Sequence, residues 1–170
     1  VKQEFEGASG GNYPMLVWYL YQYLDDQRIL EQHYEGMKRI VDYHTSIAEN
    51  HIVTRGRYGD HMLPGKSPGH EVFISKETPP PLVWTGYYYR GAYVIAQAAR
   101  LLGKTEDAKD YADLADQIKQ AFNSKWLNRE THQYSTGSQT ANLFPLALQI
   151  VPSEQRKGVL KNIVGDLENK

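Results

Sequence analysis

Helical segments with few or no charged residues alternate with amphipathic ones along this chain. Segments that are apolar or aromatic on nearly every side predict helices buried on most of their faces, and three of them occur, at 13–24, 82–102 and 138–150. In the other segments apolar residues recur at spacings of three and four, with charged residues on the remaining faces, which is typical of helices with one exposed side. These amphipathic segments occupy 27–49, 105–123 and 153–168. The sequence therefore predicts helices in pairs, each with one buried and one half-exposed member.

The spacing of these helices narrows the choice of architecture. Connections within a pair take two residues, whereas the connections between pairs run over residues 50–81 and 124–137. A simple bundle would make every helix amphipathic, and an α-solenoid would repeat with a near-constant period. A ring of inner helices surrounded by outer ones satisfies both observations. We therefore expect an all-α chain that forms part of an α/α toroid.

The long connections are expected to share one face of such a ring. With tight turns on one rim, residues 1–12, 50–81 and 127–140 all fall on the other rim, before the N-termini of the inner helices. Loops held on a rigid scaffold carry function more often than the scaffold itself. This rim is therefore the place where a cleft with a function is expected.

The middle loop carries a group of polar side chains in the sequence RYGDHMLPGK, at 57–66. Tyr58, Asp60 and His61 offer a phenol, a carboxylate and an imidazole that could bind sugar hydroxyls, and a carboxylate there could orient a water molecule or act as acid or base. Asp60 could equally cap the turn by accepting hydrogen bonds from nearby backbone N–H groups. Both interpretations stay open on the sequence.

Two more side chains near this rim are candidates for substrate contacts. Trp84 stands near the start of an aromatic-rich helix, where its ring could stack on a sugar face or pack in the core. In STGSQT, at 135–140, Ser138 is a natural N-cap for the next helix, and Gln139 could reach into the cleft.

Metal and cofactor chemistry is not predicted. His61, His70 and Glu71 could converge in the long loop, but they lack the spacing of a helical HExxH site. The chain has no cysteine, and we find no phosphate-binding loop and no dinucleotide fingerprint in the sequence. We therefore expect neither a metal site nor a cofactor.

Charge and hydropathy exclude two classes of partner. A net charge of −1 gives no electrostatic footprint for nucleic acid or an anionic membrane. No apolar run approaches the roughly 20 residues that a membrane-spanning helix needs. The first residues, VKQEFEGASGG, lack the pattern of a signal peptide. The cellular compartment stays unknown. If the chain is part of a longer bacterial protein, that protein could be periplasmic or secreted.

The chain resembles the catalytic α/α toroid of bacterial α-L-rhamnosidases, glycoside hydrolase family 78, over essentially all of its length. Helical pairs look alike, so it is the order and spacing of several pieces together that carry the resemblance. The pieces are YPMLVWYLYQYLDDQRILEQHYEGMKRIVDY, YGDHMLP, TPPPLVWTGYYYRGAYVIAQAARLLGKTEDAKDYADLADQIKQAFNSKW, and GSQTANLFPLAL followed by VPSEQR.

The resemblance implies a substrate and a mechanism. Members of this family remove terminal rhamnose with inversion of configuration, which needs a general-acid carboxyl and a general-base carboxylate about 6.5–9.5 Å apart. The family's acid lies in an Asp-Glu-Arg-Leu-Gly-Trp motif before the matched region, and its base lies after it. Neither motif occurs here, so we expect no catalytic pair in this chain. Glu71 is the carboxylate to watch, although no family motif assigns it a role.

The resemblance also sets expectations about the extent of the chain. Three helix pairs are half of an (α/α)6 ring, so residues 1–170 are expected to be an internal part of the catalytic domain, truncated at both ends. The open sides of the end helices, 13–24 and 138–150, would then favour self-association. The family commonly has a tryptophan at the position of His61, so Asp60 carries over as a sugar contact and His61 only by position.

Two other functions remain open on the sequence. A different toroid glycosidase, such as a glucoamylase-like or trehalase-like enzyme, would need a carboxylate pair of its own, with Asp60 and Glu71 as the convenient local choices. A non-catalytic helical scaffold would bind protein partners and would have no affinity for sugars. The rhamnosidase interpretation predicts a carbohydrate partner.

Overall fold

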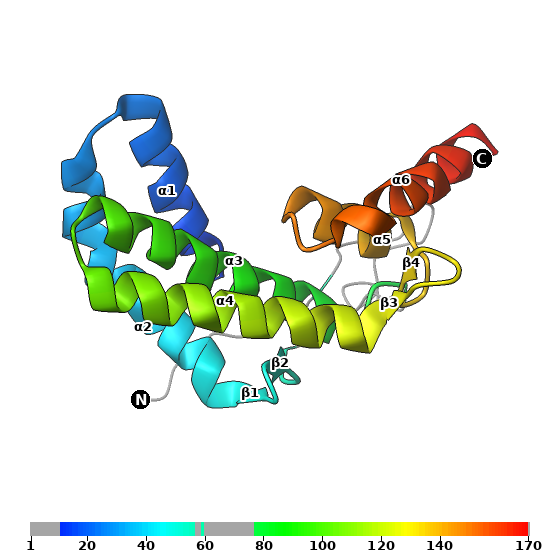
Figure 1. Cartoon of the computed structure of the whole chain (residues 1–170), viewed down its shortest axis with the longest axis horizontal. Coiled ribbons are helices and arrows are strands. Elements are labelled where there is room, and N and C mark those ends of the chain that lie inside the picture. The colour runs from blue at the N-terminus through cyan, green and yellow to red at the C-terminus, as the bar shows by residue number, and fades with distance from the viewer. Residues whose placement is uncertain (1–10, 57–58, 60–76, 170) are drawn as a thin grey trace, which may run out of the picture.

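The computed structural model describes residues 11–56, 59 and 77–169, which fold into antiparallel helical pairs (Figure 1). The helices in this described part are α1 (Tyr13–Leu24), α2 (Gln27–Ile47), α3 (Pro80–Leu101), α4 (Thr105–Trp126), α5 (Gln139–Ala147) and α6 (Ser153–Glu168). Two short hairpins accompany them, β1 (Ala48–Glu49) with β2 (Ile52–Val53) and β3 (Leu127–Asn128) with β4 (Gln133–Tyr134).

The helix order matches the sequence prediction, and the bounds of α2 and α4 differ where each helix meets a hairpin. The helix predicted over 27–49 ends at Ile47, because the chain turns into β1, and the helix predicted over 105–123 continues to Trp126, where β3 begins. The helix predicted over 82–102 runs from Pro80 to Leu101. The bounds predicted for the first and last helices, 13–24 and 153–168, are correct.

The two β-hairpins were not predicted. In the first, Ala48 pairs with Val53 across a two-residue turn, Asn50-His51. Both turn residues have positive φ, 49° and 66°. A two-residue hairpin turn of this kind requires positive φ at both positions, which asparagine tolerates better than most residues. The second hairpin pairs Leu127 with Tyr134.

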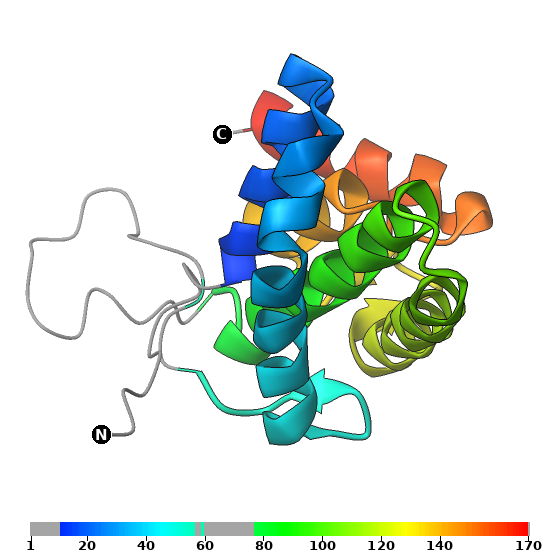
Figure 2. The same ribbon diagram turned by 90° about the vertical axis from the view of Figure 1, so that its left-hand side faces the viewer.

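The long helix α3 is the centre of the fold. It lies beside α4 along its whole length and also contacts α1, α2 and α5 (Figures 1 and 2). The expectation that this segment is buried on most faces is confirmed, since nearly every residue from Leu82 to Ala99 lies in the core or at its edge. The amphipathic prediction for α2 is confirmed by its buried stripe, Leu30, Tyr34, Met37, Val41 and His44.

The burial predicted for α1 is wrong in this chain. Only Pro14 and Val17 are buried. The helix packs on α2 and α3 from one side, and its other side has no described element against it. The exposed large side chains of α1 are Leu16, Tyr19, Leu20, Tyr23 and Leu24.

The predicted apolar face of α6 is only partly correct. Ile163 is buried together with Val159, whereas Leu160, Val164 and Leu167 are exposed. Helix α5, which was predicted over 138–150, has nine residues and ends at Ala147. The outer stripe of α6, Leu160, Val164 and Leu167, is open to solvent.

Candidate functional site

Two rim segments that are distant in sequence are joined at the start of α3. The hydroxyls of Thr78 and Ser138 lie 2.9 Å apart in a hydrogen bond, and the Thr136 hydroxyl donates to the backbone carbonyl of Glu77. Thr78 is fully buried. The Ser138 hydroxyl also accepts a hydrogen bond from the backbone N–H of Ala141, 3.2 Å away. Ser138 therefore caps α5, as predicted, and fastens the preceding turn to the segment that enters α3.

Glycines bring a third stretch of backbone to the same place. A Cβ atom at Gly59 would lie 2.9 Å from the Cα atom of Pro80 and 3.3 Å from the carbonyl oxygen of Thr78. A Cβ atom at Gly56 would lie 2.5 Å from Nε1 of Trp84. These separations are below van der Waals contact, so both approaches depend on the missing side chain. The chain before and after residues 60–76 is thus held against the first turns of α3.

An aromatic cluster supports this end of the molecule from inside. The ring centroid of His44 lies 5.9 Å from that of Trp84 and 5.8 Å from that of Tyr88, both edge to face. His44 is 3% exposed, and its Nδ1 has no hydrogen-bond partner among the described residues. Burial lowers the pKa of its imidazole to about 4. The ring is therefore neutral at neutral pH.

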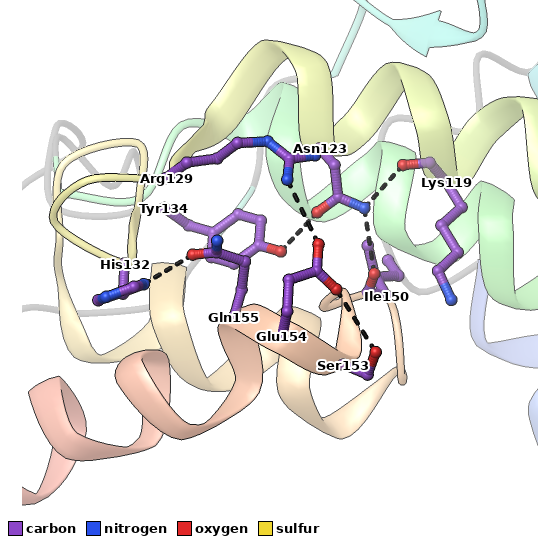
Figure 3. Close-up of polar contacts among 9 residues, drawn as sticks. All are labelled: Lys119, Asn123, Arg129, His132, Tyr134, Ile150, Ser153, Glu154 and Gln155. Carbon is purple, nitrogen blue, oxygen red and sulfur yellow. Dashed lines mark hydrogen bonds and ion pairs between the residues drawn. The ribbon is translucent and has the colours of Figure 1, made fainter.

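The β3–β4 hairpin is fastened to the helices around it (Figure 3). The hydroxyl of Tyr134 donates to Oδ1 of Asn123 on α4 at 2.5 Å, and the Asn123 amide donates to the carbonyls of Lys119 and Ile150. Burial raises the pKa of the Tyr134 phenol, which therefore stays protonated and able to donate. On the side of α6, His132 Nδ1 lies 2.7 Å from Oε1 of Gln155.

These contacts fix the loop that follows β4. The backbone N–H of Tyr134 donates to Oδ1 of Asn142 on α5, and the Asn142 amide donates to the carbonyl of Gly137. Arg129 and Glu154 add an ion pair at 3.3 Å across the hairpin and α6. Residues 135–138 are thereby held between three helices, which makes this part of the rim a rigid platform.

The structure places two of the residues that the sequence marked as substrate contacts. Trp84 is buried, 3% exposed, within the aromatic cluster. Gln139 is exposed on the first turn of α5, and its amide donates to Oδ2 of Asp166 on α6 at 2.7 Å. The other predicted site residues, Tyr58, Asp60, His61 and Glu71, lie outside the described residues. All of these roles remain predictions.

Sequence reasoning missed Thr78 and Thr136, whose hydroxyls join the two segments. A threonine is a weak signal on its own, because only the fold reveals which distant backbone group it reaches. It also did not assign a role to His44, although the spacing of Met37, Val41 and His44 by four and three residues places this histidine on the inner face of α2. Histidine on an otherwise apolar stripe was the available signal.

Neither a cluster of metal ligands nor a membrane-spanning helix occurs in the described part of the chain. No group of three or more histidine, aspartate or glutamate side chains gathers there in an arrangement suited to a metal ion. The histidines and glutamate that the sequence singled out, His61, His70 and Glu71, lie outside that part. None of the described helices has the length and hydropathy to cross a lipid bilayer.

The fold and the rim together define a class of protein. Buried inner helices and half-exposed outer ones, with loops gathered where an inner helix begins, are the arrangement of an α/α-toroid domain. The chain belongs to the family of bacterial alpha-L-rhamnosidase six-hairpin glycosidase domains, whose family profile matches residues 9–170. The fold prediction, an all-α chain forming about three helix pairs of an (α/α)6 toroid, is confirmed.

Curated relatives agree with this assignment. The chain is 30% identical over 142 residues to an alpha-L-rhamnosidase of Alteromonas sp. (strain LOR), an alignment that covers 83% of this chain and 15% of that protein. It is 26% identical over 153 residues to an alpha-L-rhamnosidase of Streptomyces avermitilis, covering 90% and 14%. The chain thus spans about one seventh of the length of the relatives that it matches.

Solved structures show the same fold. An alpha-L-rhamnosidase structure from Dictyoglumus thermophilum superimposes with a TM-score of 0.81 at 38% identity, covering 92% of this chain and 17% of that one. A structure of the Streptomyces avermitilis enzyme complexed with L-rhamnose superimposes with a TM-score of 0.76 at 22% identity, covering 94% and 14%. At the latter identity the likeness supports the fold alone.

Proposed function

We propose that this chain is part of the catalytic toroid of an inverting glycoside hydrolase that removes terminal α-L-rhamnose from glycans or glycosides. The observation that carries the proposal is the family match over residues 9–170. The relatives named above are alpha-L-rhamnosidases, and one of them has been solved with L-rhamnose bound. The role of this chain within the enzyme is to form one section of the ring and of its substrate-binding rim.

The rim supports the proposal through its construction. Two segments are tied together at the start of α3 by Thr78, Thr136 and Ser138, and the backbone at Gly56 and Gly59 packs against the same turns. Such a platform can hold sugar-binding side chains in fixed positions, which limits the entropy lost when a ligand binds. We assign the sugar contacts to Tyr58, Asp60, His61 and Gln139, with Asp60 as the principal hydrogen-bond acceptor for sugar hydroxyls, whereas the buried Trp84 supports the rim from inside.

The catalytic carboxyl pair is assigned to parts of the enzyme outside this sequence. Inversion needs a protonated carboxyl on one side of the scissile bond and a carboxylate that activates water on the other. Glu71 is the only carboxylate in the long loop that we retain as an alternative. The domain is accordingly proposed to extend beyond both ends of residues 1–170.

Self-association is proposed as a second property of the chain as it stands. The exposed side chains of α1, together with Leu143 on α5 and the outer stripe of α6, form apolar faces at both ends of the helix array. Removing apolar surface from water lowers the free energy by about 25 cal/mol per Å². Two copies can therefore lower their free energy by burying these faces against each other.

Binding of L-rhamnose to the 170-residue chain tests the proposed function. Isothermal titration is expected to give saturable binding that is lost in Asp60→Ala and retained in Asp110→Ala. Asp110 is a matched control, because its exposed carboxylate lies on α4, away from the rim. Absence of binding by the unmodified chain, or equal binding by both variants, would contradict the assignment of the rim.

Hydrolysis provides a separate readout. The chain is expected to release no aryl alcohol from an aryl α-L-rhamnoside, because we place neither catalytic carboxyl in it. Measurable turnover that disappears in Glu71→Gln would move the catalytic role to that residue.

A further inference from the structure

A groove runs between α3 and α4 at the end of α3 that is away from the rim. Two adjoining hollows of about 290 Å³ and about 500 Å³ form it, and they share Arg100 and Ala112 in their walls. The smaller hollow extends to Gln149, and the larger hollow extends to the α3–α4 turn at Gly103. The shared walls make the two hollows one elongated groove.

The groove exists because the facing side chains are small and the third helix pair is short. Its floor is built largely from alanines, which let the two helices approach while leaving space above the floor. Helix α5 contacts α3 near Gly86 and ends at Ala147. The floor residues are Ala96, Ala108, Ala112 and Ala115.

One end of the groove is aromatic. Tyr93 is half-buried there, and its ring centroid lies 6.3 Å from that of Tyr89, with the ring planes tilted by 31°. The guanidinium of Arg90 lies 5.0 Å from the Tyr93 ring centroid and holds the ring in place. A fixed tyrosine ring with a hydroxyl tip offers both an apolar surface and a hydrogen-bonding group to a ligand.

The sides of the groove carry both charges in near balance. The cations Arg100 and Lys119 line the groove together with Asp116, and Lys109 and Asp113 form an ion pair of 3.1 Å. A site for an anion or a cation would be lined predominantly by the opposite charge. Charged side chains of both signs instead donate to and accept from the hydroxyls of a neutral ligand.

Several of these side chains are already oriented. Gln97 accepts a hydrogen bond from Arg100 at 3.3 Å, and Lys119 donates to the carbonyl of Gln149 at 3.2 Å. Asp116 is exposed and receives no hydrogen bond from the described residues. Its carboxylate is thus available to a ligand that lies along the groove.

We propose that this groove binds a short neutral oligosaccharide, with a sugar ring against Tyr93 and its hydroxyls hydrogen-bonded to Asp116, Arg100 and Gln97. The elongated shape fits consecutive sugar units better than a single compact ligand. An amphipathic helix would require apolar sides, whereas these sides are charged. The inference rests on the groove alone and does not depend on the proposed function of the rim.

Nuclear magnetic resonance titration of the 170-residue chain tests this site. Neutral trisaccharides of α-linked rhamnose, α-linked glucose and β-linked glucose are the probes, each added separately, with inorganic phosphate as the anionic comparison. At least one trisaccharide is expected to shift the backbone amides of Ala96, Ala112 and Ala115 in a saturable way. Shifts absent with all three sugars, or stronger with phosphate, would overturn the proposal.

Variants then assign the contacts. Asp116→Ala and Tyr93→Ala are each expected to weaken trisaccharide binding by about tenfold, the effect of losing one good contact of about 1.4 kcal/mol. Asp116 is exposed, so its variant remains folded even if Tyr93→Ala does not, which circular dichroism will show. Asp110→Ala, on the same helix but outside the groove, is expected to bind as the unmodified chain does. Equal binding by Asp116→Ala and Asp110→Ala would overturn the assignment.

Discussion

Acidification should destabilise this fold through one side chain, His44. The imidazole is 3% exposed among the rings of Trp84 and Tyr88, and its Nδ1 has no hydrogen-bond partner in the described part of the chain. Protonation would therefore place a positive charge in an apolar environment with no nearby acceptor to stabilise it. Burial accordingly lowers the pKa of His44 from 6.5 to about 4.

The sign and size of the effect follow from this difference. Because the unfolded chain binds the proton at higher pH than the folded chain does, the stability that neutral His44 provides is complete above pH 6.5. It is lost progressively as the pH falls from 6.5 to about 4. At 1.36 kcal/mol for each pH unit, the total loss is about 3 kcal/mol, a large part of the 5–15 kcal/mol typical of a domain.

Urea denaturation at pH 7.5 and pH 4.5 measures this loss. Between these two pH values, the free energy of unfolding should fall further in the unmodified chain than in His44→Phe. The difference between the two falls should be most of the about 3 kcal/mol that His44 accounts for. Titrating carboxylates contribute to both proteins and cancel in the comparison. His51→Asn, a change at a less buried histidine in the β1–β2 turn, is expected to behave as the unmodified chain does. Equal losses in the unmodified chain and His44→Phe would refute the reasoning.

Three further predictions concern packing, hydrogen bonding and association. Asn123→Ala should lower the free energy of unfolding by about 2–3 kcal/mol in urea denaturation, because it leaves buried partners unpaired; an unchanged midpoint would contradict the brace in Figure 3. Gly86→Ala should lower the free energy of unfolding by about 1–3 kcal/mol, because the added Cβ atom clashes with α5. Gly165→Ala, where a Cβ atom meets nothing within 4 Å, should instead raise it by about 0.5–1 kcal/mol, as measured in thermal melts. Sedimentation should show concentration-dependent self-association that Leu20→Lys with Tyr23→Lys reduces, and a monomer at all concentrations would disprove it.

The helical part of the fold was accessible from the sequence because burial leaves a periodic record. The sequence of α3, whose charged residues are only Arg90 and Arg100, indicates a helix surrounded by protein, and the stripe from Leu30 to His44 indicates the inner face of α2. Both predictions depend only on which side chains avoid water. The order of buried and half-exposed helices then indicated the toroid.

The errors arise where burial depends on neighbours rather than on the helix itself. Helix α1 has the composition of a buried helix, yet Tyr23 is 87% exposed because no described element lies against that side. The shortness of α5 has a similar origin. The chain turns after Ala147 and ends the helix there, although the apolar run in the sequence continues to residue 150. A pattern within one segment cannot reveal what packs against it.

The candidate site was predicted in location more than in detail. Two of the three connections that were grouped on one rim do meet, as the bonds from Thr78 and Thr136 to partners in the other segment show. The buried position of Trp84 is one of the two placements that the sequence left open, whereas the bond from Gln139 to Asp166 could not be foreseen, because it depends on how α5 and α6 pack. The contribution of Asp60 remains a prediction.

A crystal structure of this chain with L-rhamnose tests the central claim most directly. The account predicts the sugar at the rim, beside the junction of Thr78 and Ser138 at the start of α3, with a hydroxyl bonded to Asp60. Crystals in which the rim is empty at saturating L-rhamnose, or in which the sugar lies only in the groove between α3 and α4, would contradict the assignment of the rim as a rhamnose-binding surface.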